Sequence, residues 1–227
     1  MRVFASGQSN AMGRGTGGPN WATVSPDVRV WNNINPLGDN GTAFVTAAEA
    51  KALGTFQYTD RNNIFVWFCD KLARTLFEPV DLTMVARGGS TLSLWHPDEQ
   101  TYPMLQECIA VWAATGQAPA DVFVWHQGES DVPNPESYIE AFAALLANLK
   151  AGGVIDDNTI VIVGGLVENS AERVLFNRNV LMKLPGTVYA RSYGLPVYDG
   201  NHFTAHAMTR YGAARYASAY RFARLRR

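Results

Sequence analysis

The sequence predicts one α/β domain, a three-layer α/β/α sandwich built on a mainly parallel sheet. Short apolar segments alternate with longer segments of helical periodicity along the whole chain. Such alternation favours parallel strands joined by helices that cross over either face of the sheet. The chain is 227 residues long, which suits one sizeable core, and it shows no internal repeat or linker. We therefore expect residues 1–227 to form a single domain.

Short segments rich in Val, Ile and aromatic residues are predicted strands. They are Arg2–Ser6, Val28–Trp31, Val80–Ala86, Asp121–Trp125, Ile160–Gly164 and Val188–Ser192. Segments with apolar residues three and four positions apart are predicted helices. They are 64–76, 104–112, 137–150, 171–183 and 205–225. The stretches 15–20 and 32–41 are rich in Pro, Gly and Asn, which is typical of surface loops, and the shape of the longer stretch 32–57 is left open.

Composition excludes several classes of partner. A net charge of -1 gives no broad attraction for polyanions, so we expect no nucleic-acid partner. The basic cluster Arg221, Arg224, Arg226 and Arg227 is expected to solvate the end of the last helix. No apolar run approaches the length of about 20 residues that spans a bilayer, so no membrane partner is expected.

The cysteines and the first residues bear on the compartment. Cys69 and Cys108 lie in apolar segments and are predicted to be buried free thiols. Gly7 follows Met1 too closely to leave room for a signal peptide. A cytoplasmic protein, a virion-associated protein and a mature secreted form all fit this sequence, which does not indicate an oligomeric state.

Four polar loops follow predicted strands and should meet at one edge of the sheet, because ligands of open parallel sheets bind beyond the carboxyl ends of the strands. The loops are Gly7-Gln8-Ser9-Asn10, Arg87-Gly88-Gly89-Ser90, His126-Gln127-Gly128-Glu129-Ser130-Asp131 and Asp199-Gly200-Asn201-His202. Singly, each has a structural explanation: a helix cap, a turn with positive φ, buried polar residues, or a surface ion pair. Together they contain every part of an acyl-transfer site.

These blocks resemble the SGNH hydrolase superfamily, which has a flavodoxin-like fold. Within it they are most similar to the sialate O-acetylesterase-like and carbohydrate esterase family 6 (acetylxylan esterase) branch. The resemblance rests on the segment 7–15, on Gly88-Gly89-Ser90 with Trp95, on Trp125 followed by residues 126–131, and on Asp199 with His202. The third block is the most specific, and the order of the blocks covers nearly the whole chain.

The resemblance implies a serine acetylesterase. Ser9 would be the nucleophile, His202 its general base and Asp199 the carboxylate that orients the imidazole. No Gly-x-Ser-x-Gly pattern of the lipase type surrounds Ser9. The expected substrate is an acetylated carbohydrate, and no cofactor or metal is needed.

The resemblance also implies an oxyanion hole. Its donors would be the backbone amide of Ser9, a backbone amide of the Gly88-Gly89 turn and the side-chain amide of Gln127. Glu129 would support His202 or replace Asp199 as its acid.

Three further residues are candidates for substrate binding, and each has a structural alternative. Gln8 precedes the nucleophile. Arg14 lines the pocket or lies on the surface, and Trp95, followed by His96, stacks on a sugar ring or anchors the core.

Two other functions remain open. His202 and His206 stand four residues apart, and His126 lies near Glu129, so a metal hydrolase is a rival, although the His-Glu-x-x-His signature is missing. The alternative is a catalytically silent or virion-associated carbohydrate-binding module on the same fold.

Overall fold

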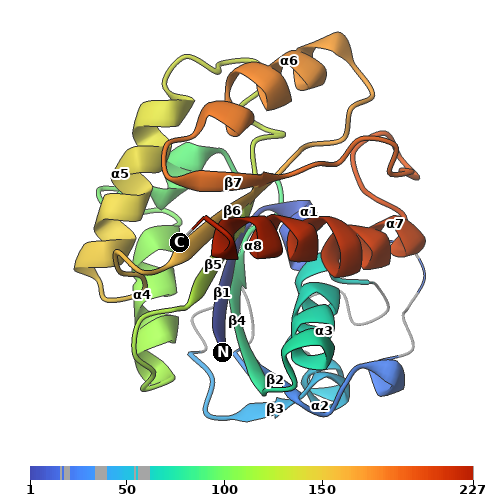
Figure 1. Ribbon diagram of the computed structural model, residues 1–227. Coiled ribbons are helices and arrows are strands. Elements are labelled where there is room, and N and C mark those ends of the chain that lie inside the picture. Colours follow the sequence, from blue (N-terminus) through green and yellow to red (C-terminus); the bar gives the residue numbers. More distant parts are fainter. Residues whose placement is uncertain (16, 18–20, 34–39, 54, 56–61, 227) are drawn as a thin grey trace.

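The computed structural model describes residues 1–15, 17, 21–33, 40–53, 55 and 62–226. Most residues of the predicted loops 15–20 and 32–41 lie outside the described residues. Within the described part, seven strands form one sheet in the order β3-β2-β4-β1-β5-β6-β7 (Figure 1). The strands are β1 (Arg2–Gly7), β2 (Val28–Trp31), β3 (Phe44–Thr46), β4 (Val80–Ala86), β5 (Val122–His126), β6 (Ile160–Gly164) and β7 (Thr187–Ala190).

Helices cover both faces of this sheet and make the predicted three-layer α/β/α sandwich. They are α1 (Ser9–Met12), α2 (Ala47–Ala52), α3 (Ile64–Leu76), α4 (Met104–Ala114), α5 (Tyr138–Ala151), α6 (Ala171–Asn179), α7 (Ala205–Arg210) and α8 (Ala217–Arg224). Six of the strands are parallel to one another, and β3 alone runs antiparallel to its neighbour β2. The predicted fold class is therefore confirmed. None of the described helices is both long enough and apolar enough to span a membrane.

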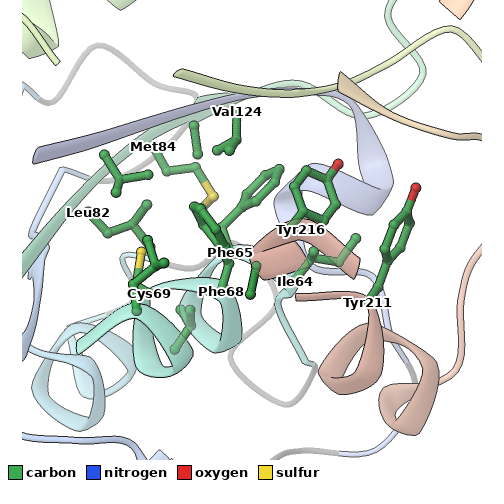
Figure 2. Packing of buried hydrophobic residues seen from close by; sticks show 14 of the residues in the cluster. Ile64, Phe65, Phe68, Cys69, Leu82, Met84, Val124, Tyr211 and Tyr216 are labelled. Atoms are coloured by element: carbon green, nitrogen blue, oxygen red, sulfur yellow. The ribbon is translucent and has the colours of Figure 1, made fainter. Parts of the chain in front are cut away.

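The central strand β1 shows how the sheet separates two apolar cores. Val3 and Ala5 belong to the cluster beneath α3, α7 and α8, whereas Phe4 belongs to the cluster beneath α4 and α5. Successive side chains of a strand point to opposite faces, so one strand contributes to both cores. Figure 2 shows part of the first cluster, where Phe65 and Phe68 of α3 pack beside Tyr216.

The sequence did not predict β3 or α2. A strand of three residues is too short for a periodicity signal. The start of α2 does carry a sequence signal of another kind, because Thr46 and Glu49 form a reciprocal capping box at its first turn. The predicted loop 32–57 thus contains a strand and a helix in its described part.

Two predicted helices are interrupted. The helix 171–183 ends at Asn179, where Val180 leaves helical geometry and a 3-10 turn (Leu181–Lys183) buries Leu181. The helix 205–225 contains a π-helical segment (Tyr211–Tyr216) between α7 and α8. Gly212 lies in that segment so close to α3 that an added Cβ would come 2.0 Å from the Ile64 carbonyl oxygen. The close approach of two helices, which periodicity does not report, accompanies this bulge.

Candidate active site

Three neighbouring strands bring the candidate residues to one level of the sheet. β1 lies between β4 and β5, and Gly7 at its end is in register with Ala86 and His126. The residues that follow these three positions therefore leave the sheet side by side. This register brings the loops that begin at Gln8, Arg87 and Gln127 to the same edge.

Gly7 makes the turn from β1 into α1 possible. Its φ is +144°, and an added Cβ would lie 2.0 Å from the carbonyl oxygen of His126. The next residue, Gln8, donates its N–H to that same carbonyl at 2.9 Å. Only glycine fits so near a neighbouring backbone. The turn makes Ser9 the first residue of α1.

Ser9, His202 and Asp199 form a continuous hydrogen-bonded chain. The Oγ of Ser9 lies 2.9 Å from Nε2 of His202, and Nδ1 of His202 lies 2.6 Å from Oδ2 of Asp199. The other oxygen of Asp199 accepts the N–H groups of Asn201 and His202, at 3.0 and 2.8 Å. One short turn thus fixes the carboxylate relative to the imidazole.

The environment of Asp199 keeps it ionised. Burial raises the pKa of Asp199, but the hydrogen bond from His202 and the two backbone donors outweigh burial and hold the pKa at about 2. An ionised carboxylate accepts the proton on Nδ1 of His202. Nε2 is then left to accept the hydroxyl proton of Ser9.

A cavity of about 220 Å³ opens at Ser9 and His202. Its lining residues are Gln8, Ser9, Arg14, Gly89, Glu129, Ser130, Arg173, Asn201 and His202. Ligand cavities commonly measure about 300–1,000 Å³, so this one suits a small group. Its charged lining residues are two arginines, Arg14 and Arg173, and one carboxylate, Glu129.

Arg173 was not predicted from the sequence. It lies on α6 and donates from Nη1 to the Gly200 carbonyl at 3.0 Å and to Oδ1 of Asn169 at 3.2 Å, and from Nη2 to the side-chain oxygen of Asn201. Arg173 therefore holds the loop that carries His202. A single arginine in a predicted helix carries no sequence signal of such a contact.

Gln127 is hydrogen-bonded to other residues of the protein. It is fully buried, and its side-chain nitrogen donates to the Ser90 carbonyl at 2.9 Å and to Oδ2 of Asp131 at 2.5 Å. The same nitrogen also lies 3.3 Å from Oε1 of Gln8, so three acceptors surround its two hydrogens. Gln127 therefore fastens the 88–90 turn and is not among the residues that line the cavity, and its part in the oxyanion hole stays a prediction.

Of the two roles left open for Trp95, the structure favours the core anchor. Trp95 is 2% exposed and packs edge-to-face against Trp125, with ring centroids 5.0 Å apart. Its large apolar ring gains more from the core than from solvent, which is the alternative that the sequence left open. Arg14, by contrast, lines the cavity beside Ser9.

The Gly88-Gly89 turn lies beside Ser9, as the order of the strands requires. A Cβ added to Gly88 would come 3.7 Å from the Cβ of Ser9, and Gly89 lines the cavity with a φ of +72°. The first-turn amide of Ser9 is not capped by the Gln8 side chain. Ser9 and Gly89, from two different loops, thus line the same small cavity.

Glu129 contacts a different set of groups from Asp199. Its Oε1 accepts a hydrogen bond from Nδ2 of Asn10 at 2.8 Å and lies 3.5 Å from Nε2 of His126. Burial raises the pKa of Glu129, but the adjacent His126 ring and the hydrogen bond from the Asn10 amide bring that pKa below its ordinary value. The carboxylate in contact with the His202 ring is that of Asp199.

The residues of the rival metal site do not gather. Within the described ranges, no group of three or more His, Cys, Asp and Glu side chains could hold a metal ion. His202 points its two ring nitrogens at Ser9 and Asp199, and His126 has its Nδ1 3.0 Å from the Tyr216 hydroxyl.

Comparison with known proteins identifies the family. Residues 2–221 match the family described as carbohydrate esterase, sialic acid-specific acetylesterase. The chain belongs to this carbohydrate esterase family. Membership makes it a carbohydrate acetylesterase, a hydrolase of acetyl esters. No curated protein matches it in sequence.

Solved structures share the fold of this carbohydrate esterase at low sequence identity. A protein from Arabidopsis thaliana is 19% identical with a TM-score of 0.76, covering 97% of this chain and 98% of that one. A carbohydrate acetylesterase from Xanthomonas citri is 19% identical with a TM-score of 0.70, covering all of this chain and 57% of its own. One from Sinorhizobium meliloti is 13% identical with a TM-score of 0.56, covering 99% of both chains.

Proposed function

We propose that this carbohydrate esterase removes acetyl groups from an acetylated sugar through a covalent acetyl-Ser9 intermediate. The observation that carries the proposal is the chain Ser9–His202–Asp199, with contacts of 2.9 and 2.6 Å, at the wall of a cavity of about 220 Å³. A serine hydroxyl is a poor nucleophile until a hydrogen-bonded imidazole takes its proton.

The first half of the reaction acylates Ser9. Its Oγ attacks the acetyl carbonyl carbon, and its proton passes to Nε2 of His202. The resulting imidazolium is stabilised by the ionised Asp199. When the tetrahedral intermediate collapses, the bond from the acetyl carbon to the sugar oxygen breaks, and that oxygen takes the proton from His202.

The second half releases acetate. A water molecule gives a proton to His202 and attacks the acetyl carbon, and the bond to Ser9 breaks as the proton returns to its Oγ. We assign the negative oxygen of both intermediates to the backbone amides of Ser9 and the Gly88-Gly89 turn. Each such donor is worth about 10²–10³ in kcat.

The small volume of the cavity favours an acetyl group over longer acyl chains. Arg14 and Arg173 line it together with Glu129, so cationic side chains outnumber the carboxylate in the lining. The sugar that suits this lining carries an anionic group, since guanidinium groups bind carboxylates by paired charge-assisted hydrogen bonds. The family description names sialic acid, which carries such a carboxylate.

Hydrolysis of p-nitrophenyl acetate, butyrate and octanoate tests this function, with Ser9→Ala assayed beside the wild type. We expect acetate to be the best substrate and the variant to lose about 10⁶ in kcat. An O-acetylated sialic acid and an O-acetylated neutral sugar are then compared by acetate release. Turnover of no ester by either protein, together with binding of glycans, would instead support the carbohydrate-binding module.

A further inference from the structure

The Asn10 side chain connects the nucleophile helix to the loop that carries His202. Asn10 follows Ser9 in α1 and is fully buried. Its Oδ1 accepts the N–H of Phe203 at 3.2 Å, and its Nδ2 donates to the carbonyl of Asn201 at 3.1 Å. These two backbone groups stand immediately before and after His202. One side chain therefore holds the backbone of His202 from both sides.

Glu129 fixes the orientation of the Asn10 amide. The second hydrogen on Nδ2 goes to Oε1 of Glu129 at 2.8 Å. The Phe203 N–H can only donate, whereas a carbonyl and a carboxylate can only accept, so one orientation of the amide satisfies all three partners. Glu129 in turn lies 3.5 Å from the buried ring of His126. The carboxylate is thus held in place for Asn10, away from the His202 ring.

We propose that Asn10, oriented by Glu129, is a positioning residue that keeps Nε2 of His202 within hydrogen-bond distance of Ser9. The proposal rests on the proposed function, in which His202 is the general base. Arg173 and Asn169 also hold this loop, but they bind Gly200 and Asn201 and do not hydrogen-bond the residue after His202. Losing Asn10 would release the backbone on both sides of His202. A displacement of about 1 Å in such a group can lower a rate about 10²-fold.

Asn177 offers a matched control within the same chain. It is 1% exposed, its Oδ1 accepts the Leu166 N–H at 2.8 Å, and its Nδ2 donates to the Leu166 carbonyl at 3.0 Å and to Oε1 of Glu168 at 3.1 Å. These are the same three kinds of partner that Asn10 has: one backbone donor, one backbone carbonyl and one glutamate. Asn177 does not line the cavity. Its replacement removes equivalent hydrogen bonds, none of which goes to the loop 199–203 that carries His202.

The test compares Asn10→Ala with Asn177→Ala in the hydrolysis of p-nitrophenyl acetate, at a temperature where circular dichroism shows both to be folded. Both should lower Tm by similar amounts. We expect Asn10→Ala to lose about 10² in kcat, with KM within about twofold of wild type, and Asn177→Ala to keep kcat within about threefold.

Asn10→Asp is the second variant, with Asn177→Asp as its control. It keeps the acceptor for Phe203 and the side-chain size, but it sets a carboxylate oxygen against the Asn201 carbonyl and Glu129. It should lose kcat as Asn10→Ala does, whereas Asn177→Asp should not.

Wild-type kcat in either Asn10 variant, or an equal loss in the matching Asn177 variant, would overturn the positioning role. Ser9→Ala separates this failure from failure of the proposed function. If Ser9→Ala stays active, the nucleophile is wrong. If Ser9→Ala is inactive while the Asn10 variants keep full kcat, only the positioning role fails.

Discussion

Replacing Asp199 by Asn tests how the imidazole is oriented. In the wild type, Oδ2 of Asp199 accepts the proton on Nδ1 of His202 at 2.6 Å, while Oδ1 accepts two backbone N–H groups. In Asp199→Asn the amide oxygen can keep the two backbone bonds. The amide nitrogen then faces Nδ1 and donates to it, so the ring carries its proton on Nε2, the atom that should accept from Ser9.

This wrong tautomer should lower kcat. We expect kcat to fall about 10⁴-fold, as the equivalent change does in a serine protease, with little change in KM. Glu129→Gln is the matched comparison, because it also removes one carboxylate charge but keeps an acceptor for Asn10. We expect the kcat of Glu129→Gln to fall by no more than about 10-fold. Steady-state hydrolysis of p-nitrophenyl acetate measures both.

The same substitution should change how stability depends on pH. The pKa of Asp199 is about 2 in the folded protein, below the ordinary value of about 3.9. Because the folded pKa is the lower one, ionised Asp199 stabilises the fold above about pH 4, and this contribution is lost as pH falls towards 2. The side chain is 40% exposed, so solvent screening limits the contribution to about 1 kcal/mol. Thermal melts of Asp199→Asn should therefore decline less steeply than wild type from pH 5 to 2.

If Asp199→Asn keeps more than about a tenth of wild-type kcat while Glu129→Gln loses about 10⁴, the imidazole depends on Glu129. The orientation of His202 in the structure would then not be the one that reacts.

Three further predictions concern the cavity and the core. Arg14→Gln should raise KM for an O-acetylated anionic sugar about 10-fold or more, since one charge-assisted hydrogen bond contributes about 1.5–3 kcal/mol. KM for p-nitrophenyl acetate should stay unchanged, and an equal rise for both substrates would contradict a role of Arg14 in binding the anionic group. Gly89→Ala should destabilise the protein by about 1–2 kcal/mol, because its φ of +72° is strained for other residues; an unchanged denaturation midpoint would argue against that backbone. Burial raises the pKa of Cys69 strongly and that of Cys108 to about 12. Both thiols should therefore resist a disulfide reagent until the chain unfolds. Rapid labelling of the native protein would show instead that one of them is accessible.

The fold was largely predictable because its signals are local. Alternation along β1 and helical spacing along α3 reflect which side chains each element buries. The elements that were missed or interrupted depend on contacts distant in sequence. Gly212 marks where the C-terminal helix meets Ile64, and no window around Gly212 contains that partner.

The candidate site was predictable where its residues follow strands. Ser9 and Gly89 stand in short loops directly after predicted strands, so topology alone brings them to one edge. The loop of His202 is longer and is held there by contacts with Asn10 and Arg173. The partners of buried amides are not fixed in this way. The resemblance implied an oxyanion role for Gln127, whose side-chain nitrogen donates to Ser90 and Asp131 in the structure. The sequence left Trp95 open between a sugar contact and the core, and it packs in the core.

The most direct test of the central claim is to trap the acetyl-enzyme. Wild-type protein and Ser9→Ala are mixed with p-nitrophenyl acetate, quenched in acid within the first turnover, digested and analysed by mass spectrometry. The mechanism predicts one added acetyl group on the wild-type peptide that contains Ser9, absent from the variant and lost on longer incubation. Turnover without any acetylated Ser9 would contradict the mechanism. So would acetylation of another residue that forms and decays fast enough to account for turnover.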